Sequence, residues 1–466
     1  SAANTYTITA SSNASSTATG GGSVSAAYQI NIGSPFAVPI SGWGASTWGQ
    51  GAWGVGESST TKIRFWTQSD FGEDLVFGPD GGSIYYWDAT NGVGTRGVLL
   101  SSLGGASNVP TAQNLILVSD INRFVFCLGT NPIGSSTLDP TLLRWSDQED
   151  ATNWTPSATN QAGSLQLSRG TKIVAASQAR QEVLVWTDSS LYSLQYVGAP
   201  AVWAASIVGE NVSISSQNAV AYANGIAYWM GKDKFYKYDG RTQPLQCDVR
   251  KYVFNDFNTA QYTQVFAGTN ESFHEVWWFY CSDSATNIDK YVIYNYLENI
   301  WYFGTLARTA WLDSGLRDSP LAATYSYNLV DHEDGVDNNQ GSSAAAITAY
   351  AVSSEFDLDD GHKYMFVSRV IPDVSFDGST ATNPVVTLTL SPLANPGAGY
   401  TSPTSTGGVN NATITRTATS PVEVFTEQLD IRVRGRQLSM RIESDATGVT
   451  WQLGSPRLDM RPDGRR

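Results

Sequence analysis

The sequence is poor in cysteine, and its three cysteines fit neither a disulfide framework nor a zinc site. Cys127, Cys247 and Cys281 are an odd number, lie far apart and include no CxxC pair. We therefore expect buried free thiols and folding in a reducing compartment. Long hydrophobic runs are absent as well, which excludes a membrane-spanning helix of about 18 apolar residues.

The sequence also lacks the motifs of common catalytic and metal-binding sites. His274 is followed by Glu275 but by no second histidine four residues on, so the zinc-protease motif is missing. The acidic stretch at 331–341 lacks the spacing of a calcium loop, and we expect a solvated turn there. No Walker loop, dinucleotide fingerprint or nucleophile elbow occurs. The sequence predicts no enzyme, no cofactor and no metal, although its 42 acidic residues always offer candidates for a glycosidase pair.

Charge is scarce and mostly negative. Only 15% of the residues are charged and the net charge is −14, whereas an average domain has about a quarter of its residues charged. A protein that grips nucleic acid by neutralising phosphates should be basic, so this balance excludes a tight DNA binder. It leaves open a conduit through which DNA slides, because repulsion between like charges prevents sticking.

What the sequence does contain is a coarse repeat of short strands with a tryptophan near the end. Four short strands per unit, separated by turn residues, are the plan of a propeller blade, and blades repeat at about 40–50 residues. The sequence thus predicts an all-β chain with a β-propeller of about six blades over residues 34–350, in which 321–335 starts the sixth. The repeated tryptophans, with gaps of 58, 41, 43 and 49 residues, are Trp87, Trp145, Trp186, Trp229 and Trp278.

The two ends of the chain have a different texture. Residues 1–33 contain two alternating segments around a Ser/Thr/Gly-rich turn, which we interpret as the end of a small, partial N-terminal β domain. Residues 351–466 alternate over longer runs and predict a C-terminal β-sandwich, or outer sheets added to the propeller. Helical spacing occurs at 248–258 and predicts a helix there.

A short loop at residues 42–54, GWGASTWGQGAWG, combines three tryptophans with many glycines. Glycine lets the backbone lie flat against a partner, and tryptophan is a typical interface anchor. Trp43, Trp48 and Trp53 are therefore interface candidates. The alternative is that they plug the propeller's own face.

The one charge pattern above background lies near the C-terminus. Alternation along a strand places a row of arginines opposite Ile431 and Val433. Because the chain is otherwise acidic, we expect this row to pair with carboxylates of the same or a neighbouring subunit rather than to hold nucleic acid. The interface candidates in this region are Arg432, Arg434, Arg436, Arg465 and Arg466.

Five segments carry a family resemblance: the loop at 42–54, GEDLVFGPDGGSIYYWD (72–88), LLRWSDQEDATNWTPS (142–157), IYNYLENIWYFGTLARTAW (293–311) and RGRQLSMRIESDATGVTWQLGSPRLDMRPDGRR (434–466). They resemble the tail-nozzle proteins of short-tailed bacteriophages, which include tail tube or hub proteins and packaged-DNA stabilisation proteins. The similarity covers most of the chain, and its motifs are structural rather than catalytic. Residues 1–33 resemble the second half of a small β domain found near the start of such proteins, so we expect an upstream segment.

The resemblance implies a structural virion protein that folds in the host cytoplasm and ends up in the virion tail. It implies a homo-oligomer, a hexameric ring below the head-to-tail connector or adaptor protein. Such a ring continues the DNA channel and retains packaged DNA, while genomic DNA passes through the lumen without tight binding. It also anchors tail fibre or plug proteins. Two rival functions stay open: a lectin-like receptor-binding tail protein, whose exposed tryptophans stack on sugars, and a propeller glycosidase.

Overall fold

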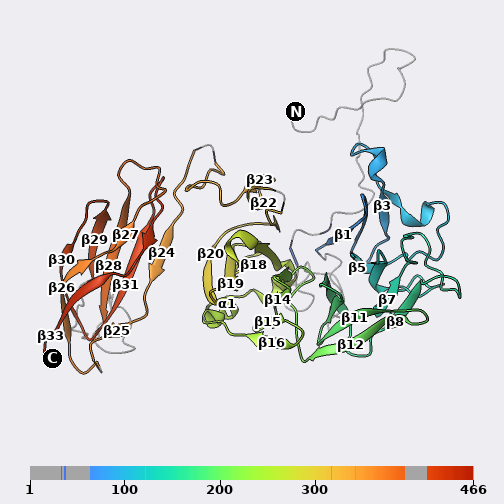
Figure 1. Cartoon of the computed structure of the whole chain (residues 1–466), viewed down its shortest axis with the longest axis horizontal. Coiled ribbons are helices and arrows are strands. Elements are labelled where there is room, and N and C mark those ends of the chain that lie inside the picture. The colour runs from blue at the N-terminus through green and yellow to red at the C-terminus, as the bar shows by residue number, and fades with distance from the viewer. Residues whose placement is uncertain are drawn as a thin grey trace, which may run out of the picture. The chain divides into compact units, whose positions relative to one another are not determined.

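The computed structural model describes residues 33, 36–37, 63–120, 122–315, 317–341, 343–359, 361–393 and 417–464. These residues form an all-β chain with one short α-helix, and the chain divides into two units. The first unit runs to Thr269 and resumes at His274–Ala307, and the second comprises Asn270–Phe273 and everything from Arg308 onward (Figure 1).

Five four-stranded antiparallel sheets follow one another in the first part of the chain, each built from strands consecutive in sequence. This succession of hairpin-connected sheets is that of propeller blades. Blade one contains β1 (Trp66–Phe71), β2 (Asp74–Pro79), β3 (Tyr85–Trp87) and β4 (Val98–Leu99). Blade two contains β5 (Gln113–Val118), β6 (Val125–Thr130), β7 (Asp139–Trp145) and β8 (Gly163–Gln166).

The next three blades have the same plan. Blade three contains β9 (Ile173–Gln178), β10 (Val183–Thr187), β11 (Ser190–Gly198) and β12 (Val202–Glu210). Blade four contains β13 (Val220–Ala223), β14 (Ile226–Met230), β15 (Phe235–Tyr238) and β16 (Thr242–Leu245). Blade five contains β17 (Phe266–Asn270), β18 (Glu275–Tyr280), β19 (Lys290–Asn295) and β20 (Ile300–Thr305). Figure 1 colours the five blades from blue to yellow.

The first strand of each blade lies next to the first strand of the following blade. Contacts join β1 to β5, β5 to β9 and β9 to β13. Asn218, just before β13, forms a parallel bridge with Phe266 of β17. The first strands begin at residues 66, 113, 173, 220 and 266, so successive blades are 47, 60, 47 and 46 residues apart. The β-propeller expected from the sequence period is confirmed.

The repeated tryptophans do not occupy equivalent strands. Trp87 and Trp145 lie on the third strands β3 and β7, whereas the other three lie on the second strands β10, β14 and β18. The 41-residue gap between Trp145 and Trp186 is therefore shorter than the 60-residue step between the starts of blades two and three. The tryptophan period locates the blades without locating equivalent strands within them.

The tryptophans on second strands pack each blade on the next. Trp186 meets Trp229 edge to face with ring centroids 5.3 Å apart, and Trp278 packs on Phe235 at 4.9 Å. All four side chains are fully buried. Burying one such ring removes ~150–250 Å² from water, which contributes several kcal/mol at about 25 cal/mol per Å². This aromatic layer is therefore a principal source of stability in blades three to five.

The predicted helix is confirmed as α1 (Arg250–Asn255), between blades four and five. Its Val253 is fully buried, and the adjacent Phe254 packs on Phe235 at 5.2 Å between ring centroids. The 3-10 turns of the described chain are η1 (Ala89–Asn91), η2 (Leu100–Ser102), η3 (Thr259–Gln264) and η4 (Glu271–Phe273).

The second unit begins with a three-stranded sheet, which we call the acidic sheet because six acidic residues lie on its strands and flanking turns between Asp313 and Asp337. It consists of β21 (Ala310–Leu312), β22 (Leu321–Ala323) and β23 (Leu329–Asp331). This segment was expected to start a sixth blade, but it groups with the second unit. The division of the chain therefore falls after Ala307 rather than at the residue-350 boundary inferred from sequence texture.

The remaining strands form two sheets that share one core, as in a β-sandwich. One sheet contains β24 (Ala349–Val352), β25 (Phe356–Asp357), β28 (Val385–Leu393), β29 (Ala418–Glu423) and β31 (Gln437–Ser444). The other contains β26 (Met365–Ile371), β30 (Leu429–Gly435) and β33 (Arg457–Pro462), and β27 (Val374–Ser375) pairs separately with β32 (Gln452–Leu453). Buried Val367, Leu388 and Val433 come from both sheets and belong to one cluster. Figure 1 draws the strands of these sheets in orange and red.

Candidate functional site: an arginine face on the C-terminal sandwich

The predicted arginine row lies on β30, an edge strand of the three-stranded sandwich sheet. Burial alternates along this strand, so that Ile431 and Val433 point into the core while Arg432 and Arg434 are exposed. Arg436 follows directly after the strand ends at Gly435. The prediction that alternation places these arginines opposite the apolar positions is confirmed for Arg432 and Arg434.

The central strand β26 brings β30 and β33 into register. Phe366 of β26 lies opposite Arg434 on one side and Arg461 on the other. Arg369 of β26 lies in the same way between Asp430 and Asp459. Because residues directly opposite in an antiparallel sheet share a face, the exposed side carries an Arg–Phe–Arg row and an Asp–Arg–Asp row.

Aromatic rings hold several of these guanidinium groups in place. Arg434 lies over the ring of Tyr364 at 4.3 Å and Arg436 lies over the same ring at 5.1 Å. Arg461 lies over Phe366 at 4.9 Å. Stacking on an aromatic ring fixes the planar guanidinium while leaving its N–H donors available. Arg434 already donates through Nε and Nη2 to Asp463, so stacking on this face holds guanidinium groups in defined positions without leaving every donor open.

Carboxylates of the same chain neutralise part of this charge. The Arg434 Nε donates to the Asp463 carboxylate at 2.6 Å, and Arg369 lies 3.8 Å from Asp459. Within the described residues, Arg432 and Arg457 make no ion pair. The arginine face, as we call this surface, comprises Arg369, Arg432, Arg434, Arg436, Arg457 and Arg461 with Asp430, Asp459 and Asp463.

The arginine face is locally positive in a chain whose net charge is −14. Six arginines stand against three aspartates. The same strands also build the sandwich core, since Leu429, Ile431 and Val433 of β30 are buried. Removing residues 430–466 would therefore dismantle the sandwich, and only point substitutions can separate the role of the arginines from the role of the strands.

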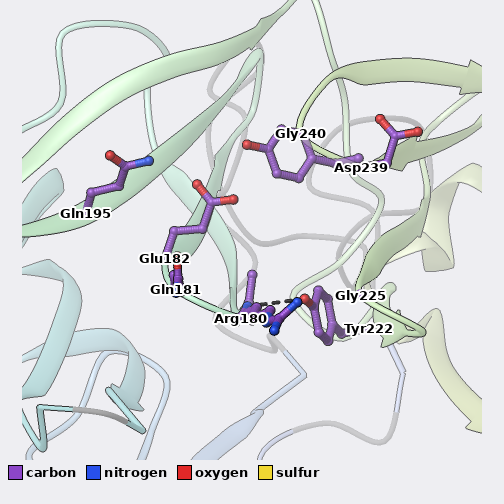
Figure 2. Close-up of a pocket in the computed structure, with 10 residues that line it drawn as sticks. Arg180, Gln181, Glu182, Gln195, Tyr222, Gly225, Asp239 and Gly240 are labelled. Carbon is purple, nitrogen blue, oxygen red and sulfur yellow. Dashed lines mark hydrogen bonds between the residues drawn. The ribbon is translucent and has the colours of Figure 1, made fainter.

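A pocket of about 530 Å³ lies between blades three and four (Figure 2). The turn between β9 and β10 supplies Arg180, Gln181 and Glu182, and the turns of blade four supply Gly225 and Asp239. The glycosidase alternative requires two carboxylates that flank the bond to be cleaved, and the acidic side chains lining this pocket are Glu182 and Asp239.

The two carboxylates of this pocket do not converge. Figure 2 shows the Asp239 carboxylate pointing away from Glu182. Glu182 itself accepts a hydrogen bond from the Ser193 hydroxyl. Burial, together with the nearby Glu182, raises the pKa of Tyr238 to about 12, so this wall of the pocket is a neutral phenol at physiological pH. In this structure the carboxylates of Glu182 and Asp239 therefore do not face each other across the pocket.

The other predicted candidates fall outside the described residues. These are Trp43, Trp48 and Trp53 of the glycine-rich loop, with Arg465 and Arg466 at the end of the chain, and the small β domain at 1–33 apart from Gly33. Their proposed contacts stay predictions.

The cysteines and His332 pack as structural side chains. All three cysteines are free, and Cys127 and Cys281 are buried. His332 accepts a hydrogen bond on Nε2 from the Arg308 Nε at 2.9 Å. In the part of the chain that the structure describes, no three His, Cys, Asp or Glu side chains are placed to hold a metal ion. No helix in that part is both long and apolar enough to cross a membrane.

Sequence reasoning found the arginines of β30 but missed the aromatic rings beneath them. Tyr364 and Phe366 are two residues apart in KYMFVSR, the spacing that puts both on one face of a strand. The signal was present, but which strand lies beside β30 depends on a pairing between residues about 70 positions apart.

No protein-family model matches the chain, and no curated protein matches it in sequence. Among solved structures, it is similar to the computationally designed Ika8 protein at 12% identity and a TM-score of 0.35, over 56% of this chain and 69% of that one. It is also similar to Hsv2 of Kluyveromyces marxianus at 7% identity and 0.32, over 57% and 73%. The AfRom2 CNH domain gives 14% identity and 0.32, over 56% and 81%. None of these likenesses bears on function. The chain is an all-β protein in which successive four-stranded propeller blades precede further C-terminal sheets.

Proposed function

We propose that this chain is a structural subunit of the tail nozzle of a short-tailed bacteriophage. The observation that carries the proposal is the arginine face, a surface of ring-stacked guanidinium groups on an otherwise acidic chain. Such groups recognise carboxylates with defined geometry, which suits permanent assembly with acidic protein surfaces.

Exposed apolar side chains on strands and turns support an assembly role. Tyr302 and Ile300 are exposed on β20, the edge strand of blade five, and Ile207 is exposed on β12, the edge strand of blade three. Phe425, in the turn after β29, is 91% exposed. Apolar edge strands favour pairing with another chain, so a protein that keeps them is expected to bury them in an assembly.

In this proposal the subunits form a hexameric ring below the head-to-tail connector, and tail fibres or a plug attach to the ring. Genomic DNA passes through the lumen. The net charge of −14 favours passage without adhesion, because phosphates and acidic loops repel each other within the Debye length of about 8 Å at physiological salt.

Electron microscopy tests this proposal directly. Virions labelled with an antibody against the chain should carry the label at the tail, and the purified chain should form rings. The purified protein should also show no appreciable affinity for duplex DNA at physiological salt. Label on the head, or a chain that stays monomeric with and without the connector, contradicts the proposal.

Glycan assays separate the alternatives. Sugar binding that is lost in the Trp48→Ala variant would favour the lectin-like tail protein. Glycan turnover that is lost in the Glu182→Gln variant would favour the glycosidase. We expect neither activity.

A further inference from the structure

The acidic sheet exposes carboxylates together with large apolar side chains. Leu312, Tyr327 and Leu329 are 60%, 98% and 70% exposed. The register places Ala310, Leu312 and Leu329 on one face of the sheet and the half-buried Trp311 on the other face. The acidic residues of this sheet and its flanking turns are Asp313, Asp318, Asp331, Glu333, Asp334 and Asp337.

Few cations of the same chain balance these carboxylates. Arg317 pairs with Asp331 at 2.8 Å. Among the described residues, no lysine or arginine lies within ion-pair distance of the exposed Asp318, Glu333 or Asp334. The acidic sheet and the arginine face are thus two surfaces of opposite charge on one unit.

We propose that the arginine face of one copy of this chain docks on the acidic sheet of a second copy. This inference rests on the proposed function, because it names the contact that would join neighbouring subunits of the ring. The occupant is a second copy because the chain itself carries the complementary surface, with carboxylates to meet Arg432 and Arg457 and apolar side chains beside them.

The contact is head-to-tail, since it uses two different surfaces. A head-to-tail contact repeats from copy to copy and closes into a ring when the rotation allows, whereas a contact between two identical surfaces stops at a dimer. The stacking of Arg434 and Arg461 on Tyr364 and Phe366 reduces the side-chain entropy lost on docking. The surfaces therefore suit the cyclic symmetry that the proposed function requires.

Charge reversal tests the contact. Arg432 and Arg457 are the best positions, because both are exposed and neither makes an ion pair within the described residues. The R432E/R457E double variant should weaken self-association at least tenfold, measured by analytical ultracentrifugation of the full chain. The matched control is R96E/R241E, which changes the net charge equally at two exposed arginines of the first unit and should assemble like the original chain.

The complementary variant supplies a rescue. D318R/D334R should also fail to assemble alone. Mixed with R432E/R457E it should assemble again, because an alternating ring then pairs opposite charges at every contact. Circular dichroism of each variant shows whether it is folded, and the mutual rescue cannot arise from misfolding.

The outcomes separate this inference from the proposed function. Rings that form normally from R432E/R457E overturn the inference, while tail labelling of virions still supports the function. Loss of assembly without rescue by D318R/D334R also overturns it, because the arginine face then binds another surface. Binding of a 60-base-pair duplex that R432E/R457E abolishes would show a nucleic-acid site instead, and overturns the inference and the proposed passage without adhesion.

Discussion

The guanidinium of Arg144 donates a hydrogen bond to the carbonyl oxygen of Asn108 at 2.6 Å inside blade two. A second bond reaches the carbonyl oxygen of Asn131 at 3.1 Å, and the ring of Trp154 lies 5.9 Å away. Arg144 is only 2% exposed, and no carboxylate within the described chain pairs with it. Carbonyl oxygens and an aromatic ring thus compensate a buried cation.

Replacing Arg144 by methionine should destabilise the first unit strongly. The substitution leaves the buried carbonyl oxygen of Asn131 and the part-buried carbonyl oxygen of Asn108 without this donor, and we expect the free energy of unfolding to fall by about 3 kcal/mol. Urea denaturation followed by tryptophan fluorescence measures the change. The exposed Arg241→Met variant is the control and should change the free energy by less than about 0.5 kcal/mol. Equal stability of the two variants would show that the buried contacts contribute little.

The stability of the second unit should fall in mild acid because of His332. Burial and the neighbouring Arg308 lower the pKa of His332 from 6.5 to about 4. The unfolded chain therefore binds a proton on this residue at a higher pH than the folded chain does, and stability is lost as the pH falls from about 6.5 to about 4. The loss should be on the order of 3 kcal/mol.

Two measurements check this expectation. The imidazole resonances of His332 should titrate near pH 4 in the folded protein. The His332→Gln variant, which keeps a hydrogen-bond acceptor for Arg308, should flatten the dependence of stability on pH in this window. Titration of His332 near 6.5 would contradict the structural environment described above.

The three thiols should be unreactive in the folded protein. Burial raises the pKa of the Cys127 thiol above its ordinary range, and raises the pKa of Cys247 and of Cys281 to about 12. Because the thiolate is the reactive form, a thiol reagent at pH 8 should modify none of them until the chain is unfolded, when all three should react. Rapid modification of one thiol in the folded protein would identify a locally open region.

The glycine-rich loop is tested by replacing Trp43, Trp48 and Trp53 together with alanine. Exposed tryptophans would be an aggregation hazard, so each should be covered by a partner or by the propeller. If the loop is an interface, the variant loses assembly while the melting temperature of the monomer stays unchanged. A large drop in the melting temperature of the monomer would instead show that the loop plugs the propeller.

The sequence was sufficient to predict blades because turn residues and alternating strands recur at a blade-like period. It did not place Trp145 and Trp186 on different strands of their blades, because a tryptophan indicates a buried strand without indicating its position in the sheet. The first strands of blades two and three begin 60 residues apart, whereas Trp145 and Trp186 are only 41 residues apart, because the tryptophan moves from the third strand to the second.

The sequence likewise predicted only part of the candidate site. The alternation around Arg432 is local and could be read from β30 alone. Tyr364 and Arg461 lie far away in sequence, and they join this face only because β26 pairs with β30 on one side and with β33 on the other. Local alternation fixes which face a side chain occupies, whereas the composition of that face depends on strand pairing.

The shift of the tryptophan from third to second strand divides the blades into two kinds of building block. Trp229 of blade four contacts Trp186 of blade three and Tyr236 of its own β15, and Phe235 of β15 packs on Trp278 of blade five. Blade four therefore presents aromatic rings to both of its neighbours. Trp145 of blade two instead contacts Phe126 within its own sheet and donates to the carbonyl oxygen of Gln161. A duplicated blade four could therefore be inserted beside blades three or five with its aromatic neighbours intact. The cluster shared by blades one and two is mostly aliphatic, with Val76, Ile116 and Val125 among its members. We therefore expect duplication of blade four to expand this propeller more readily beside blades three to five than beside blade one.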